Sequence, residues 1–156
     1  MESLKIKILD YFKGLQFNEK EHKYLVEGKP IKMSVSGIIK NFVEEVDFKQ
    51  KAINKDIYLG KPLGTTQKEW DSKKDISCKL GNETHLFGEL YPFNRHLKPR
   101  TKFEEAVINF WNDLPPTIIP IVMELQMYHK KFMFAGTADI LLYNTITDTF
   151  IIGDYK

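Results

Sequence analysis

The clearest hydrophobic pattern lies in the last third of the chain, where three apolar runs are separated by short polar turns. Residues 117–129, 132–143 and 149–156 combine β-branched and aromatic side chains with a two-residue alternation. Such runs are typical of β-strands. Lys130 lies in the first turn and Asn144 begins the second. We therefore expect three consecutive strands joined by two turns.

Each of these predicted strands carries one acidic residue among apolar neighbours, namely Glu124, Asp139 and Asp154. Regular alternation in the first strand places Glu124 on the face opposite Met123 and Leu125. In the third strand, Asp154 and Lys156 share a face, and Tyr155 lies on the other. Carboxylates in apolar strands are costly unless something positive lies between them. A divalent metal is the usual candidate.

The middle of the chain has the spacing of helices instead. Four are predicted, and serine or threonine precedes three of them, as is typical of N-caps. The first is a short helix that follows Ser34 and ends near Val43, and the second covers 48–58. The third covers 67–91 after Thr66, with Glu69 completing a capping box. The fourth covers 102–112 after Thr101. The third should bury a stripe of five residues, namely Trp70, Ile76, Leu80, Phe87 and Leu90.

A second line of residues lies beside that stripe. Gly81, His85 and Glu89 are four residues apart and so share one face of the helix. Glycine costs a helix about 1 kcal/mol relative to alanine, so Gly81 indicates close approach by backbone or ligand. The same holds for Gly136, which would let a backbone or a substrate phosphate approach Asp139.

The N-terminal segment is predicted to be a β-hairpin. Residues 5–13 fit a short strand or a helix, and residues 15–33 fit two extended pieces with a turn at Glu27-Gly28. Phe17 and Tyr24 give this hairpin an apolar face. For His22, packing beside Tyr24 is favoured over a functional role.

Composition narrows the class of protein. With 156 residues, 42% of them hydrophobic, the chain fits one globular domain. A single cysteine, Cys78, excludes a disulfide framework and a cysteine-based zinc site. We find neither a signal peptide nor an apolar run of about 20 residues, so we expect a soluble cytoplasmic protein without membrane contact.

Charge is divided unevenly along the chain. Residues 1–102 hold 20 Lys and Arg against 14 Asp and Glu, whereas residues 103–156 hold 3 against 7. An acidic segment beside a basic one suits a metal site served by a phosphate-binding surface. On charge alone, a merely solvated lysine-rich surface is the favoured explanation.

Four short motifs, taken together, are more specific. Gly81-Asn-Glu-Thr-His85, Glu124, Gly136-Thr-Ala-Asp139 and Asp154-Tyr-Lys156 resemble, in order and context, the motifs of the PD-(D/E)XK nuclease superfamily, most closely its RecB-like exonuclease branch. The segments Phe17…His22-Lys-Tyr24 and Ser34-Val-Ser36 also resemble the N-terminal region of its phage and bacterial members. The resemblance covers residues 17–156.

This resemblance implies an α+β, restriction-endonuclease-like fold. Helices would pack on a three-stranded sheet, forming the αβββ part of the family's αβββαβ core. Residues 1–65 would form the hairpin and first helices of a single domain, and 66–156 its core. The helix and strand that follow the last motif in the family are missing here. We therefore expect a fragment of a longer protein or a truncated product, and a homo-oligomer is an alternative source of the missing parts.

The resemblance also implies a function. The chain would be a hydrolase, a Mg²⁺- or Mn²⁺-dependent deoxyribonuclease and probable exonuclease of DNA repair or recombination. His85, Asp139 and Asp154 would bind the metal, and Lys156, Asp154, Asp139 and Glu124 would act in catalysis, with Gly81, Glu89 and Gly136 in support. The alternatives are a catalytically silent nucleic-acid-binding remnant of the same fold, and an α+β domain whose acidic residues only solvate a sheet edge.

Overall fold

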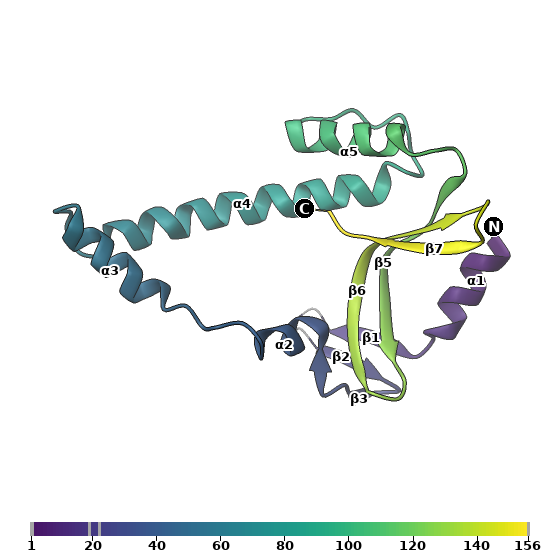
Figure 1. Ribbon diagram of the computed structural model, residues 1–156, viewed down its shortest axis with the longest axis horizontal. Helices are drawn as coiled ribbons and strands as arrows, with labels where there is room; N and C mark the ends of the chain where they lie inside the picture. Colours follow the sequence, from purple (N-terminus) through teal and green to yellow (C-terminus); the bar gives the residue numbers. More distant parts are fainter. Residues whose placement is uncertain (1, 19, 22, 156) are drawn as a thin grey trace.

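The three predicted C-terminal strands are present, and they form an antiparallel meander. A computed structural model describes residues 2–18, 20–21 and 23–155. In it, β5 (Ile118–His129), β6 (Phe134–Asn144) and β7 (Thr149–Gly153) follow one another, and β6 pairs with both neighbours (Figure 1). The strand β7 ends at Gly153, earlier than predicted. Helices and antiparallel strands together make this an α+β protein.

The sheet has a fourth strand that the sequence pattern did not predict. The two-residue strand β4 (Met33–Ser34) pairs in parallel with the start of β6. A separate small sheet contains β1 (Leu15–Asn18), β2 (Lys23–Val26) and β3 (Lys29–Pro30). The predicted hairpin is thus a three-stranded sheet, with the expected turn at Glu27-Gly28 between β2 and β3.

The predicted apolar face of that small sheet is present. Phe17 and Tyr24 lie opposite each other on β1 and β2, with ring centroids 4.7 Å apart. Such cross-strand aromatic pairs stabilise a hairpin. His22 lies outside the described residues, so its predicted packing beside Tyr24 stays a prediction.

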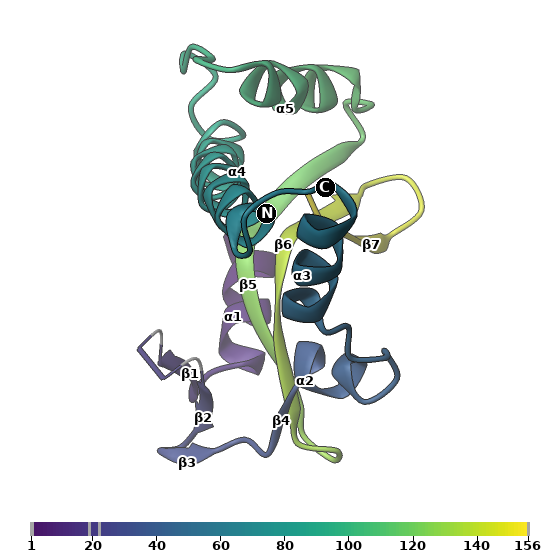
Figure 2. The same ribbon diagram turned by 90° about the vertical axis from the view of Figure 1, so that its left-hand side faces the viewer.

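Helices cover both faces of the large sheet. On one face, Leu4, Ile8 and Phe12, from α1 (Glu2–Tyr11) and the residue after it, pack against a cluster formed by Ile121, Val122, Leu125 and Leu141. On the other face, α4 (Thr65–Leu90) and α5 (Lys102–Asp113) contribute to a cluster formed by Phe87, Tyr91, Val107, Trp111, Ile140 and Leu142. Figure 2 shows α1 beside β5, and α5 at the opposite end of the molecule from β1, β2 and β3.

Most predicted helix starts are confirmed, and one is wrong. Ser34 caps α2 (Val35–Lys40), Thr101 caps α5, and α3 covers Phe48–Tyr58. However, α4 begins at Thr65 after Gly64, whose φ is 87°, so Thr66 is inside the helix. The buried carboxylate of Asp56 accepts the N–H groups of Gly64 and Thr66 instead. An acid from the preceding helix therefore replaces the local capping box.

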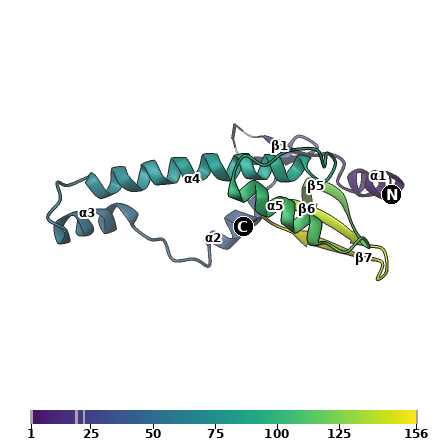
Figure 3. The same ribbon diagram turned by 90° about the horizontal axis from the view of Figure 1, so that it is seen from above.

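The long helix α4 projects away from the sheet together with α3 (Figures 1 and 3). Most of the predicted buried stripe is consequently wrong, because only Phe87 is buried, whereas Ile76 is 65% and Leu90 is 50% exposed. Amphipathic spacing marks a face that could be buried, but half of this helix has only α3 beside it. In the described part of the chain, no helix is long and apolar enough to cross a membrane.

Candidate metal centre

Three of the predicted site residues converge where α4 crosses the sheet. His85 comes from α4, Glu124 from the middle of β5 and Asp139 from the middle of β6. A ring nitrogen of His85 and one carboxylate oxygen of each acid lie within 4.8 Å of one another. All three side chains are half-buried. One imidazole and two carboxylates at this spacing can share a single cation.

Asp139 is the centre of this arrangement. Its Oδ2 lies 3.5 Å from Nδ1 of His85 and accepts the backbone N–H of Tyr155 at 3.0 Å. Its carboxyl also forms a hydrogen bond with Asp154, the residue that follows β7. Asp154 therefore lies beside the group formed by His85, Glu124 and Asp139. Of the predicted ligands, His85 and Asp139 belong to this group, whereas Asp154 lies beside it, and the third member is Glu124.

Electrostatics at the site favour a cation. Burial raises the pKa of Glu124, and the neighbouring charges of Asp139 and Glu89 raise it further. Burial also raises the pKa of Asp139, as does its hydrogen bond with Asp154, against the opposing effect of the Tyr155 N–H and His85. Carboxyls held this close disfavour each other's ionised form. A divalent ion between them would relieve that repulsion.

The backbone at Glu124 is unusual. Its φ is 50°, in the left-handed region, although it lies in the middle of a strand. The predicted alternation of β5 is wrong at this point. Met123 packs in the cluster under α4 and α5, whereas Leu125 packs in the cluster under α1, rather than on the same face. Strained backbone of this kind costs about 1–3 kcal/mol and is often found at functional sites.

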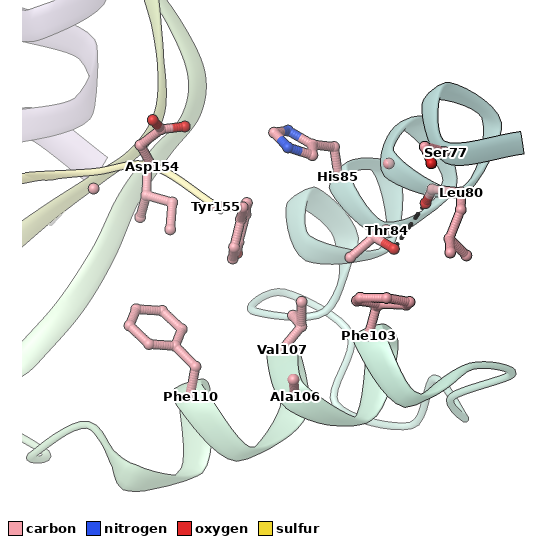
Figure 4. Close-up of a pocket in the computed structure, with 13 residues that line it drawn as sticks. Ser77, Leu80, Thr84, His85, Phe103, Ala106, Val107, Phe110, Asp154 and Tyr155 are labelled. Carbon is pink, nitrogen blue, oxygen red and sulfur yellow. Dashed lines mark hydrogen bonds between the residues drawn. The ribbon is translucent and has the colours of Figure 1, made fainter. Parts of the chain in front are cut away.

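Tyr155 joins the metal centre to the helices, a role that the sequence analysis missed. Its hydroxyl donates to the carbonyl oxygen of Gly88 at 3.1 Å and accepts from Nε1 of Trp111 at 3.0 Å. Burial raises the pKa of Tyr155 to about 12, although the bond from Trp111 acts in the opposite direction. Asp154 and Tyr155 point in opposite directions, as predicted (Figure 4). The phenol positions the backbone N–H that binds Asp139.

The three residues predicted to support the site have different roles. Glu89 lies near enough for its charge to raise the pKa of Glu124. The Cβ position of Gly81 has no neighbouring atom within 4 Å, so no protein backbone approaches it. A Cβ on Gly136 would lie 2.9 Å from Cγ2 of Val35, so the close neighbour there is a side chain of α2. Lys156 lies outside the described residues.

A cavity of about 600 Å³ opens beside the metal centre, between α4 and α5 (Figure 4). His85, Asp154 and Tyr155 line one end. Its remaining lining is mostly apolar and includes Leu80, Gly81, Phe103 and Phe110. Besides the candidate metal ligands and Tyr155, the polar side chains that line the cavity are Ser77 and Thr84.

Comparison with known proteins identifies no matching family model, no matching curated protein and no matching solved structure. The resemblance to PD-(D/E)XK nucleases thus comes from short motifs alone. The function has to be inferred from those motifs and from the geometry of the side chains that carry them.

Proposed function

We propose that this protein is a metal-dependent deoxyribonuclease of the PD-(D/E)XK type, with the properties of the RecB-like branch. The observation that carries this proposal is the convergence of His85, Glu124 and Asp139 within 4.8 Å. These three residues come from three elements far apart in the sequence. Each was singled out from its motif, and chance placement of all three around one point is improbable.

The order of the elements supports the same proposal. A long helix bearing His85 precedes β5, β6 and β7, which form an antiparallel meander and carry one motif acid each at or just after the strand. This is the helix-and-three-strand arrangement expected of the αβββ part of a restriction-endonuclease-like core. The helix α5 is inserted between α4 and β5 and packs on α4 through Val107 and Phe87.

The donor atoms fit Mg²⁺ or Mn²⁺. Carboxylate oxygens are the ligands that Mg²⁺ prefers, and it keeps several waters when bound. Mn²⁺ accepts the same oxygens together with imidazole. When bound, such an ion would offset developing phosphate charge and lower the pKa of a water molecule. We assign Asp139 and Glu124 as direct ligands, with Asp154 and His85 completing the set.

The remaining residues of the chain would position the reaction. The N–H of Tyr155 occupies one lone pair of Asp139 Oδ2 and so fixes the orientation of that carboxylate. Glu89 adds negative charge beside Glu124, which strengthens attraction for a cation. We assign Lys156, by its place in the Asp154-Tyr-Lys156 motif, to orient the attacking water or to steady phosphate charge.

DNA is the proposed substrate. Metal-dependent hydrolysis of a phosphodiester bond uses a cation at the phosphate, and the carboxylates here could hold one. The lysine-rich first two-thirds of the chain would provide contacts to the phosphate backbone that do not depend on sequence. Linear DNA would be degraded from its ends if the enzyme is an exonuclease.

Incubation of the purified chain with linear and closed circular duplex DNA tests this proposal. We expect loss of linear DNA in Mg²⁺ or Mn²⁺ and none in EDTA. Asp139→Ala and Lys156→Ala should abolish this loss. Asp75→Asn, an exposed acid on α4 away from the cluster, is the matched control and should leave the rate unchanged.

Three other results would contradict the nuclease proposal in different ways. DNA binding without cleavage in any metal would favour a silent nucleic-acid-binding remnant. Binding of neither metal nor DNA would mean that the acidic cluster has a structural role only. Degradation that is unaffected by Asp139→Ala would indicate a contaminating nuclease.

A further inference from the structure

The cavity between α4 and α5 has a composition that the metal chemistry does not explain. We propose that it receives unpaired terminal nucleotides of a single-stranded DNA end, with their bases stacked on Phe110 and Phe103. This inference rests on the proposed nuclease function and deepens it, because it names the form of the substrate. At about 600 Å³ the cavity is within the usual range of small-ligand pockets.

Two aromatic rings of α5 are available for stacking. Phe110 is 39% exposed and Phe103 is 55% exposed, although both line the cavity. They are seven residues apart, which is two turns or about 10 Å along the helix. Figure 4 shows both rings on the side of α5 that faces α4. The cavity thus has one aromatic surface near the metal centre and a second one farther away.

The lining of the cavity favours bases over phosphates. Along α4 it contains Leu80 and Gly81 together with two hydroxyl groups, those of Ser77 and Thr84. The Thr84 hydroxyl already donates to the Leu80 carbonyl oxygen. An apolar lining would desolvate a phosphate at high cost, but it suits the flat face of a base. Stacking on aromatic side chains is tolerant of sequence because every base has a π-face.

The cavity is continuous with the candidate metal centre. His85 belongs to both, and Asp154 and Tyr155 line the cavity beside it. The ring of Phe110 lies 6.3 Å from that of Tyr155, between centroids. A nucleotide whose phosphate is bound at the metal centre would therefore direct its base toward Phe110. The open space at Gly81 leaves room for it.

The size of the cavity determines which form of DNA can enter. Its volume of about 600 Å³ is that of a pocket for one small ligand. A duplex, whose major groove alone is about 12 Å wide, is too large for it. Unpaired terminal nucleotides fit in such a cavity, whereas a duplex does not. Strand separation at the end would have to come before cleavage.

Fluorescence of 2-aminopurine tests the inference independently of cleavage. A short single strand with this base at one end, prepared once for each end, is mixed rapidly with the full chain in Mn²⁺. We expect an early quenching phase, before any product forms, for at least one end. A blunt duplex with the same label should bind without this phase. DNA binding is measured in parallel by anisotropy.

Matched variants separate stacking from structural effects. Phe110→Leu and Phe103→Leu keep apolar volume but remove the ring, and each should weaken single-strand binding about 5- to 150-fold. Phe110→Tyr should restore binding. Phe132→Leu removes an exposed ring in the turn between β5 and β6 and should have no effect. Circular dichroism checks that each variant is folded.

The outcomes distinguish the two proposals. The stacking inference would be overturned, and the nuclease proposal would stand, if metal-dependent DNA binding or cleavage occurred with no quenching. In that case the affinity of Phe110→Leu and Phe103→Leu would also be unchanged. Equal affinity for blunt duplexes and single strands would overturn it as well. Absence of any DNA binding or cleavage would overturn both.

Discussion

The ring of Tyr155 occupies the space that a side chain on Gly88 would need. A Cβ built on Gly88 would lie 2.6 Å from both Cε2 and Cζ of Tyr155, and the phenol hydroxyl donates to the Gly88 carbonyl oxygen. Because the N–H of Tyr155 binds Asp139, this contact connects the packing of α4 to the metal centre. Gly88, which has no side chain, thereby fixes the position of Tyr155.

We predict that Gly88→Ala will reduce metal affinity. The added methyl group must displace the Tyr155 ring, and overpacking costs about 1–3 kcal/mol. Alanine returns about 1 kcal/mol of helix propensity, so the net loss of unfolding free energy should be about 2 kcal/mol or less. Chemical denaturation and calorimetric titration with Mn²⁺ measure the two effects.

Gly81→Ala is the matched control on the same helix. Its methyl group meets no protein atom within 4 Å, so it should stabilise the protein by about 0.5–1 kcal/mol. Metal affinity should stay unchanged. A loss of metal affinity in both variants would mean that α4, rather than the Tyr155 contact, responds to substitution.

We predict that Mg²⁺ or Mn²⁺ will raise the melting temperature. A ligand at 100 times its Kd stabilises the folded state by about 2.7 kcal/mol. For a protein of this size, that corresponds to a rise of roughly 5–10 °C. Calorimetry in EDTA and in saturating metal measures the shift. Asp139→Asn should remove most of it, and Asp75→Asn should leave it intact.

The pKa values of Glu124 and Asp139 predict how stability depends on pH in EDTA. Both are raised in the folded protein, chiefly by burial, whereas in the unfolded chain they lie near 4. Above pH 4 these two carboxyls therefore bind more protons in the folded state than in the unfolded state. The stability that they contribute must fall as pH rises through their folded pKa values.

Urea denaturation across pH 4–8 measures this trend. Glu124→Gln and Asp139→Asn should each flatten it. In saturating Mn²⁺ the stabilisation by the metal should instead grow with pH, because the metal binds the deprotonated carboxylates. Stability in EDTA that increases over this range in the wild-type protein, with no change in the two variants, would contradict the assigned electrostatics.

Tyr155 predicts a second pH dependence, in the alkaline range. Its pKa is raised to about 12 in the folded protein, against about 10 in the unfolded chain. The stability that its phenol contributes is therefore complete below pH 10 and is lost as pH rises toward 12. Tyr155→Phe should remove this component. It should also destabilise the protein at pH 7 by about 1–3 kcal/mol, because Trp111 and Gly88 lose their partner.

Local patterns predicted much of the fold. Features determined by residues close together in the sequence were predicted. They are the bounds of α3, the caps at Ser34 and Thr101, and the three C-terminal strands. The start of α4 was wrong because its cap, Asp56, comes from another helix. The buried stripe was wrong at Ile76 because nothing in the spacing of a helix shows where the sheet beside it ends.

The three residues that converge could be singled out from the sequence, whereas the contacts around them could not. Glu124 and Asp139 stand out because carboxylates in apolar strands need partners, and His85 stands out because it shares a helix face with Gly81 and Glu89. The left-handed φ of Glu124 leaves no signal, since no glycine marks it. The contact between Gly88 and Tyr155 had a faint signal, a second glycine two turns after Gly81 in one helix.

The strand β7 exposes three neighbouring large apolar side chains, namely Phe150, Ile151 and Ile152. Among the described residues it pairs only with β6, so the backbone N–H and C=O groups on its outer edge are not paired with another strand. Edges of this kind recruit further strands. Asp154 and Tyr155 follow β7 directly, and the N–H of Tyr155 binds Asp139. The unpaired edge of the sheet therefore ends beside the residues that surround Asp139.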